Sequence, residues 1–166
     1  MSPTRPLPAL TVDNRAFWTG GKRGELLIYR CQECGYYVHP PVRYCPRCES
    51  RHVEAEPVSG RASVASFTIN YQKWEPELHV PYVMALVELE EQADVRLVTN
   101  IVNCPPDAVT IGMPVHVLFE SSADVWTCRL AAISTGMNTN RALQNRKLSE
   151  NWSPCPARNE SMKFQL

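Results

Sequence analysis

Apolar and polar residues alternate along much of residues 25–133, and this period of two is typical of half-buried β-strands. Within residues 61–71 the alternation changes phase, which predicts a β-bulge near Ala65 and Ser66. The pattern predicts strands at residues 25–30, 52–58, 61–71, 81–90, 95–102, 115–120 and 124–133. The last five, with a longer connection at 72–80, favour a small five-stranded barrel of the OB type, with a two-sheet sandwich as the alternative.

A short helix is predicted ahead of the strands, between residues 11 and 19. Thr11 or Asp13 would accept hydrogen bonds from the free N–H groups of the first turn, and the pair Gly20-Gly21 would end the helix. Behind the last strand, residues 134–166 are polar and rich in Asn, Ser and Arg. We expect this tail to be flexible, with at most a marginal helix at 138–150.

Four cysteines form two Cys-x-x-Cys pairs, Cys31 with Cys34 and Cys45 with Cys48, with ten residues between the pairs. Two such tight turns aim four thiolates at one ion, the arrangement of a tetrahedral structural metal site. Zinc is the expected occupant, and iron in a rubredoxin-like site is the alternative. Four thiolates leave no open position for a reaction, so we expect His39, between the pairs, to be a hydrogen-bonded surface residue rather than a ligand.

The chain is therefore predicted to be mainly β, with four parts in order. These are an N-terminal segment with a short helix at 1–25, a zinc ribbon at 26–58, an OB-type barrel at 59–133 and the polar tail at 134–166.

Composition restricts the function further. The chain is 44% apolar, and it has no run of the roughly 18 apolar residues that a membrane span requires. Residues 1–10 are rich in proline and lack the apolar centre of a signal peptide, so a cytoplasmic protein is expected. Residues 1–61 carry nine Lys or Arg and six Asp or Glu, whereas residues 62–133 carry three and nine. An acidic barrel argues against nucleic-acid binding, which needs basic surface.

Catalysis by this chain alone is poorly supported. The histidines have no neighbouring Ser or Cys in a known nucleophile setting, and the cysteines outside the two pairs are odd in number and widely spaced. These residues are His39, His52, His79 and His116, and Cys104, Cys128 and Cys155. Neither a catalytic site nor a disulfide framework is expected.

A set of short motifs nevertheless occurs in a distinctive order. It comprises Phe17-Trp18, Leu26, Cys31-Gln32-Glu33-Cys34-Gly35, Pro40-Pro41, Cys45-Pro46-Arg47-Cys48, Ser59-Gly60, Pro81-Tyr82-Val83 and Ile111-Gly112-Met113-Pro114-Val115. Over residues 11–131 this order resembles the family of acyl-CoA-associated OB-fold proteins with a rubredoxin-like zinc ribbon, formerly a domain of unknown function. The tail after Ala131 is longer than the ending usual in that family.

The resemblance implies a non-catalytic accessory subunit that forms a hetero-oligomer with a thiolase-like partner and helps to hold an acyl-CoA thioester. The stretch at 74–82 is most similar to the steroid-aldolase branch, which implies a role in retro-aldol cleavage of steroid side-chain CoA esters. A CoA site needs basic residues for its phosphates, and those near the helix and ribbon are Lys22, Arg23, Arg43 and Arg47. Residues 72–82, with Trp74 and Tyr82, are a candidate wall for the pantetheine arm.

Two other classes of function stay open at this stage. OB folds and zinc ribbons also occur as nucleic-acid modules, although the acidic barrel speaks against that role. The same four cysteines would also serve a rubredoxin-like electron carrier if the metal is iron.

Overall fold

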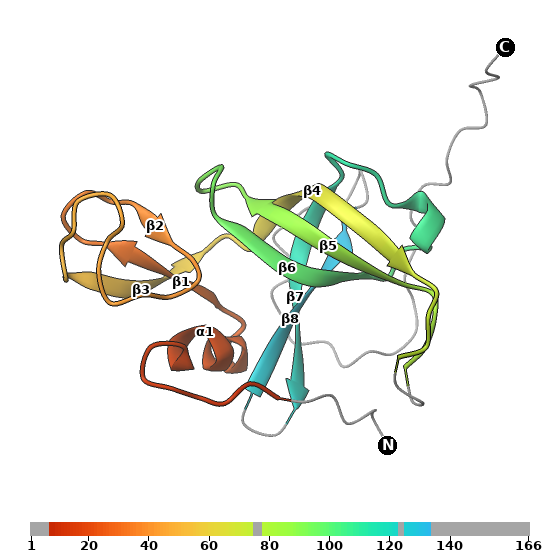
Figure 1. Cartoon of the computed structure of the whole chain (residues 1–166), viewed down its shortest axis with the longest axis horizontal. Helices are drawn as coiled ribbons and strands as arrows, with labels where there is room; N and C mark the ends of the chain where they lie inside the picture. Colours follow the sequence, from red (N-terminus) through yellow and green to blue (C-terminus); the bar gives the residue numbers. More distant parts are fainter. Residues whose placement is uncertain (1–6, 75–77, 123–124, 134–166) are drawn as a thin grey trace, which may run out of the picture.

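A three-stranded ribbon and a five-stranded barrel lie side by side in the chain, with a short helical segment between them (Figure 1). The computed structural model describes residues 7–74, 78–122 and 125–133. The mainly β prediction is confirmed. The predictions for the tail at 134–166, Cys155 included, fall outside the described residues, as does part of the 72–82 connection.

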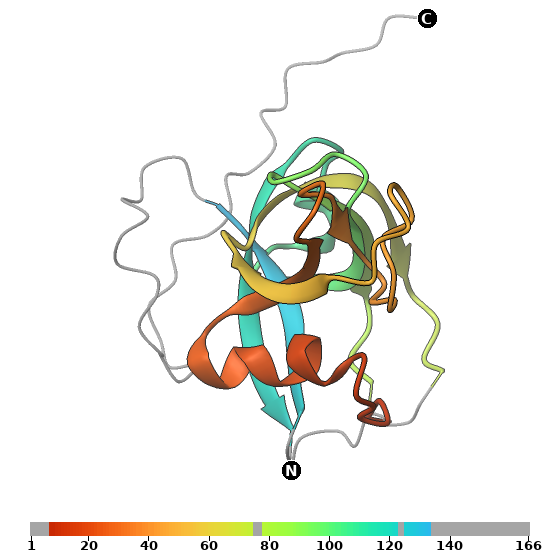
Figure 2. The same ribbon diagram turned by 90° about the vertical axis from the view of Figure 1, so that its left-hand side faces the viewer.

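The helical segment consists of α1, Arg15–Thr19, and a 3-10 turn, η1, Gly20–Arg23. The prediction that Gly20-Gly21 ends the α-helix is confirmed, since Gly20 is its C-cap, but the chain continues as a 3-10 turn up to Gly24, whose φ is 75°. The two glycines also allow close packing. A Cβ added to Gly21 would lie 2.6 Å from side-chain atoms of both Phe119 and Trp126 on the barrel. Figure 2 shows this segment lying across strands of the barrel.

The predicted helix cap, by contrast, is wrong. Asn14 precedes α1, and no side chain caps the helix. Thr11 instead forms a turn with Asn14, in which the Thr11 amide donates to Asn14 Oδ1 at 2.8 Å and the Asn14 amide donates to Thr11 Oγ1 at 3.3 Å. Asp13 is engaged elsewhere, because it binds Arg43 of the ribbon.

The ribbon contains β1, Leu26–Cys31, β2, Tyr37–Val38, and β3, Val53–Val58, in the order β2-β1-β3. Both pairings are antiparallel, and β1 pairs with β3 along its whole length, from Leu26 opposite Val58 to Cys31 opposite Val53. The two strands predicted around the cysteines are thus present, and the two-residue β2 is an addition.

The barrel is closed in the order β4-β5-β6-β8-β7, so the sandwich alternative is wrong. Its strands are β4, Arg61–Asn70, β5, Tyr82–Leu89, β6, Arg96–Val102, β7, Pro114–Ser122, and β8, Val125–Ala132, with a 3-10 turn, η2, at Pro106–Ala108. The pairing of β4 with β5 shifts register between Val64 and Ser66, which confirms the predicted bulge.

The ribbon and the barrel share one hydrophobic core. Leu26 and Ile28, at the start of β1, pack among the inward-facing valines and leucines of the barrel and are 2% and 1% exposed. Gly60 joins β3 to β4 with φ 72°, and a Cβ there would lie 2.4 Å from Val117 Cγ1. The joint between the two units therefore requires glycine.

A second connection between the units uses a side chain in place of a strand. Gln92, in the turn between β5 and β6, accepts a hydrogen bond from the Tyr37 amide at 2.9 Å and donates one to the Tyr37 carbonyl at 3.0 Å. Beside it, Tyr36 donates its hydroxyl hydrogen to Asp94. These bonds attach the outer edge of the ribbon to the β5–β6 turn.

Candidate functional site

The four paired cysteines converge at the end of the ribbon that lies away from the barrel core. Their sulfur atoms all lie within 4.8 Å of one another, with Cys31 and Cys48 at 3.5 Å and Cys34 and Cys45 at 3.6 Å. A tetrahedral site with metal–sulfur bonds of about 2.3 Å has sulfur–sulfur edges of roughly 3.8 Å. The donor set and its spacing therefore fit one tetrahedral thiophilic ion.

The two pairs are built on the same turn. The Gly35 amide donates to the Cys31 carbonyl, and the Glu49 amide donates to the Cys45 carbonyl, each at 2.9 Å. Gly35 and Glu49 both have left-handed backbones, with φ 72° and 60°. Backbone amides also approach the sulfurs, and hydrogen bonding from Cys34 lowers the pKa of the Cys31 thiol to about 6. Thiolate, the form that binds metal, is thus favoured at Cys31. Burial and hydrogen bonds to the other three sulfurs raise the pKa of the Cys48 thiol to about 12.

His39 is not a fifth ligand, but the prediction of a hydrogen-bonded surface residue is wrong. Its ring packs against Phe17 at 5.1 Å between centroids, and burial lowers its pKa from the ordinary value of 6.5. It makes no hydrogen bond to any described residue. The reason is that the helical segment covers this part of the ribbon loop, which sequence spacing does not reveal.

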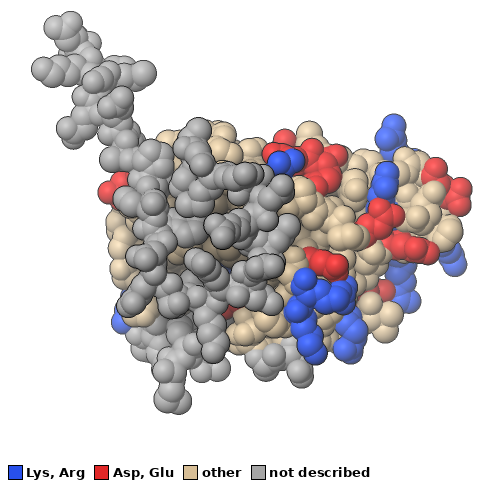
Figure 3. Space-filling view, turned by 180° about the vertical axis from the view of Figure 1, so that it is seen from behind, with Lys and Arg blue, Asp and Glu red and all other residues tan. Residues whose placement is uncertain are grey.

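The four basic residues proposed for CoA phosphates lie in three places. Lys22 and Arg23 are exposed at the end of η1, where basic side chains gather on one face of the molecule (Figure 3). Arg23 pairs with Glu25 at 2.8 Å, and Arg43 pairs with Asp13 at 2.9 Å. Lys22 and Arg47 form no ion pair with another residue in the described part of the chain.

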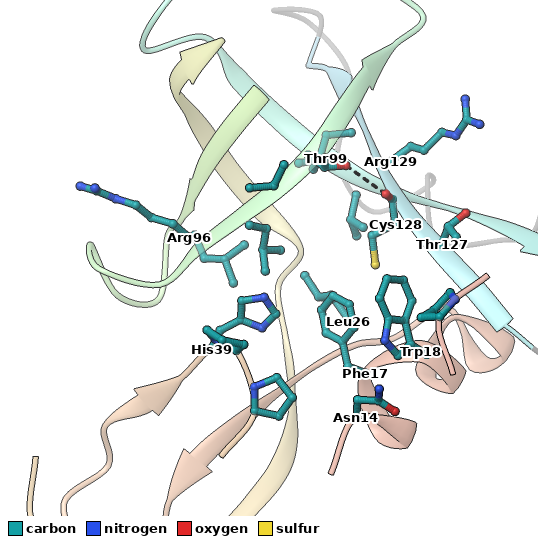
Figure 4. Close-up of a pocket in the computed structure, with 18 of the residues that line it drawn as sticks. Asn14, Phe17, Trp18, Leu26, His39, Arg96, Thr99, Thr127, Cys128 and Arg129 are labelled. Carbon is teal, nitrogen blue, oxygen red and sulfur yellow. Dashed lines mark hydrogen bonds between the residues drawn. The ribbon is translucent and has the colours of Figure 1, made fainter. Parts of the chain in front are cut away.

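A cavity of about 870 Å³, which was not predicted, lies between the helical segment, the ribbon loop and strands β6 and β8 (Figure 4). Phe17, Trp18, His39 and Cys128 are among the residues that line it. Trp74, in the predicted pantetheine wall, is 70% exposed and does not line it. The sequence features that could have indicated this cavity are the adjacent aromatic residues Phe17 and Trp18 and the prolines at 40–41. Nothing in the sequence, however, predicts that these residues lie against the barrel.

Groups that could perform catalysis are scattered. His52 lies between Glu33 and Glu54, at 3.6 Å and 3.3 Å, on the exposed ribbon surface and without a neighbouring nucleophile. Burial raises the pKa of the Cys128 thiol to about 12, which makes it a poor nucleophile. Within residues 7–74, 78–122 and 125–133, no nucleophile pairs with a base.

Within the described residues, no helix has the length and apolar character needed to cross a bilayer.

Two family models match consecutive parts of the chain. Residues 18–54 match "ChsH2, rubredoxin-like zinc ribbon domain", and residues 55–120 match "ChsH2, C-terminal OB-fold domain". The ribbon containing the four cysteines and the barrel therefore correspond to two recognised domains.

Curated relatives include two hydratase subunits. The chain is 40% identical over 111 residues to a probable enoyl-CoA hydratase alpha subunit of Thermomonospora curvata, over 67% of this chain and 34% of the relative. It is 38% identical over 117 residues to the 3-oxo-4,17-pregnadiene-20-carboxyl-CoA hydratase alpha subunit of Mycobacterium tuberculosis, over 70% and 37%. The chain thus spans about a third of the length of these two proteins.

Shorter relatives match over more of their length. A DUF35 domain-containing scaffold protein of Methanocaldococcus jannaschii is 37% identical over 57% of this chain and 67% of its own length. The benzoylsuccinyl-CoA thiolase subunit BbsA of Thauera aromatica is 31% identical over 43% and 49%. Among solved structures, a chain of the Ltp2-ChsH2(DUF35) aldolase has a TM-score of 0.69 and 35% identity, over 76% of this chain and 98% of that one.

Proposed function

This chain belongs to the DUF35 family of proteins with a rubredoxin-like zinc ribbon and an OB fold, and we propose that it is a non-catalytic accessory subunit of a thiolase-like enzyme acting on acyl-CoA thioesters. The observation that carries this proposal is the structural match to a chain of the Ltp2-ChsH2(DUF35) aldolase, because the match covers 98% of that chain. The relative named as a thiolase subunit supports it further.

The scattered catalytic groups support the assignment of the chemistry to the partner. Acyl transfer and retro-aldol cleavage each need a positioned acid or base, and acyl transfer also needs a nucleophile. The one histidine held between two carboxylates, His52, is exposed on the ribbon surface. This chain would therefore supply contacts and a rigid shape, while the partner supplies the reacting groups.

We propose that Cys31, Cys34, Cys45 and Cys48 hold a structural zinc ion. The ion would join the two knuckles of the ribbon, since neither turn has a hydrophobic core of its own. Iron would turn the same site into an electron carrier. Metal analysis of aerobically purified protein separates the two, because a colourless protein with one zinc per chain supports the scaffold role, and a coloured iron protein contradicts it.

Among the four basic residues proposed for CoA phosphates, Lys22 and Arg47 are the strongest. Each is exposed and has no ion-pair partner in the described part of the chain, so binding a phosphate would break no existing bond. Arg23 and Arg43 would first have to leave Glu25 and Asp13. Ion pairs between such exposed side chains contribute little to stability, so both arginines remain candidates for binding the CoA phosphates.

The finer proposal is retro-aldol cleavage of steroid side-chain CoA esters. It rests on the aldolase structure and on the relative whose name specifies a pregnadiene carboxyl-CoA substrate. The chain spans only about a third of that relative, which makes this proposal narrower than the one for an accessory subunit.

Nucleic-acid binding finds little support on the barrel. The usual OB-fold binding surface is the outer face of the second and third barrel strands, here β5 and β6. Met84 and Val98 are exposed there, and Arg96 is paired with Glu88 at 3.0 Å. A face with apolar side chains and a neutralised arginine lacks the cationic groove that single strands require.

Co-expression with a thiolase-fold protein from the same genome tests the main proposal. We expect the two proteins to co-purify, the complex to cleave a steroid side-chain CoA ester, and neither protein alone to do so. Calorimetry of the complex with CoA should show weaker binding for Lys22→Ala and Arg47→Ala and unchanged binding for Arg61→Ala, which removes an arginine paired with Glu90 on the barrel. Absence of a stable complex would refute the subunit role, and unchanged CoA affinity in both variants would remove these residues from the site.

A further inference from the structure

Exposed apolar side chains gather on one side of the barrel. The described part of the chain has ten large apolar residues that are exposed, and five of them come from the connection between β4 and β5 or from outward positions of β5 and β6. Monomeric proteins scatter such residues singly, whereas a contiguous apolar patch marks a site of interaction. We call these five residues the apolar face: Tyr71, Trp74, Val80, Met84 and Val98.

The strand register joins the apolar face into one surface. Val83 and Ala85 are buried inside the barrel, so Met84 between them points outward. Leu86 follows on the same side of β5 and lies opposite Val98 of β6, which makes Val98 a diagonal neighbour of Met84. The ribbon and α1 lie to the left of and below these strands in Figure 1, away from the apolar face.

Trp74 is 70% exposed but held in one orientation. Its indole Nε1 donates to Asn70 Oδ1 at 3.3 Å, and Asn70 Nδ2 donates to the Gln72 carbonyl at 3.1 Å. Asn70 pairs with Tyr82 on β5, two residues before Met84, so Trp74 stands at one end of the apolar face. An exposed ring that is already oriented loses little entropy when a partner covers it, and tryptophan in such a position carries much of the binding energy of an interface.

The centre of the apolar face carries no unpaired charge. Glu88 and Arg96, the next outward pair along β5 and β6, neutralise each other at 3.0 Å. Thr68 and Asn100, which lie opposite Met84 on either side, are polar but uncharged. Aromatic residues and methionine without charge are typical of the centre of a protein–protein interface. The surface therefore fits an apolar surface of another protein.

The size and shape of the apolar face decide between a second copy and a different protein. With about 200 Å² for a whole aromatic side chain and about 100 Å² for an aliphatic one, the exposed fractions correspond to roughly 400 Å². Two copies would bury roughly 800 Å² in total through it, less than the about 1,200–2,000 Å² of a stable complex. The outer face of a closed barrel is convex, so an equally convex second copy could not extend the contact far. A concave partner could.

We propose that the apolar face is the surface on which the thiolase-like partner docks. Trp74 enters a pocket on that partner, and a concave apolar surface around the pocket covers Met84 and Val98. The proposal rests on the proposed function, which supplies the partner, and adds the surface that binds it. The contact is thus on the barrel rather than on the ribbon that holds the four cysteines.

The affinity of single-residue variants for the thiolase-fold protein of the same genome tests the proposal. The full metal-loaded chain is used, and the Kd is measured by biolayer interferometry. Trp74→Ala should weaken binding at least roughly thirtyfold, as the loss of a central aromatic residue does, and Trp74→Phe should recover most of that loss. Val98→Lys would bury a charge against the apolar partner and should weaken binding at least roughly tenfold.

Two variants outside the apolar face are matched controls. Tyr44→Ala removes an aromatic residue that is 57% exposed on the ribbon loop, and Ile111→Lys places the same charge at a residue that is 71% exposed. Both should bind as the parent does, and all five variants should keep the parent's melting temperature, because the replaced side chains are exposed.

The outcomes separate this proposal from the proposed function. If the parent binds the thiolase-fold protein and Trp74→Ala and Val98→Lys bind equally well, the docking surface is overturned and the subunit role stands. If the parent does not bind, the subunit role is refuted and this proposal with it. Sedimentation of the parent alone as a dimer that Val98→Lys converts to a monomer would assign the apolar face to a second copy, and would also overturn the proposal.

Discussion

Replacing Gly60 by Ala should be among the most destabilising small substitutions in the chain. The backbone has φ 72°, where an alanine costs about 1–2 kcal/mol. The added Cβ would also lie 2.4 Å from Val117 Cγ1, a contact that forces the strand or the valine to move. Overpacking of this kind costs about 1–3 kcal/mol, so we expect a loss of about 2–5 kcal/mol from the free energy of unfolding.

The measurement is urea unfolding of the zinc-loaded protein, followed by tryptophan fluorescence. Gly112→Ala is the matched control, because Gly112 has φ 80° but no atom within 4 Å of an added Cβ. The control should lose only the backbone contribution, about 1–2 kcal/mol. The difference between the two variants isolates the contact with Val117.

A second substitution tests that contact directly. Val117→Ala removes the atom that clashes, so the double variant should be less destabilised than the sum of the two single variants. Equal losses in Gly60→Ala and Gly112→Ala, together with additive effects in the double variant, would refute the argument that the joint between ribbon and barrel is sterically constrained.

Three further perturbations should have specific outcomes. Cys45→Ser should abolish stoichiometric metal binding and unfold the ribbon, since a structural zinc contributes on the order of 10 kcal/mol to the free energy of folding. The control Cys104→Ser should keep the metal. Metal analysis and circular dichroism measure the two effects. Gln92→Ala removes both hydrogen bonds to Tyr37 and should cost about 1–3 kcal/mol in urea unfolding. Burial lowers the pKa of His39 below 6.5, so the unfolded chain takes up a proton at a higher pH than the folded chain does. The free energy of unfolding should therefore fall as the pH drops below about 6.5. In His39→Phe this part of the fall, measured as the urea midpoint at each pH, should disappear.

Each of these outcomes has a clear contrary result. An unchanged melting profile after loss of metal from the Cys45 variant would show that the ribbon folds without it. If Gln92→Ala leaves the urea midpoint unchanged, the hydrogen bonds to Tyr37 do not stabilise the attachment of the ribbon to the barrel. Parallel pH curves for His39→Phe and the parent chain would assign the pH dependence to other groups.

Much of the fold follows from local patterns. The alternation of apolar residues determines which face of each strand is buried, so the strands and the bulge at residues 64–66 were predictable. The cysteine spacing was equally informative, because two tight turns with two intervening residues leave the sulfurs little freedom. The pair Tyr37-Val38 was missed, since two residues carry no period.

The features that the sequence did not reveal depend on contacts between residues that are far apart along the chain. Local rules interpret Gly20-Gly21 as a helix end, whereas the barrel side chains packed against Gly21 require the missing Cβ. The ion pair between Asp13 and Arg43 joins residues 30 positions apart. The cavity combines residues from the N-terminal segment, the ribbon and four strands of the barrel, and no single segment carries its pattern. Sequence spacing therefore predicts the metal centre well and the cavity not at all.

The bond between the Gln92 side chain and the edge of the ribbon makes the Tyr37 amide a natural reporter of motion between the two units. This amide donates to a barrel side chain rather than to its own sheet, so its hydrogen exchanges with solvent when the Gln92 side chain releases the edge of the ribbon. Its protection factor would then measure the free energy needed to open this contact. A partner that binds across both units would slow exchange at this one amide, even if it touched neither residue.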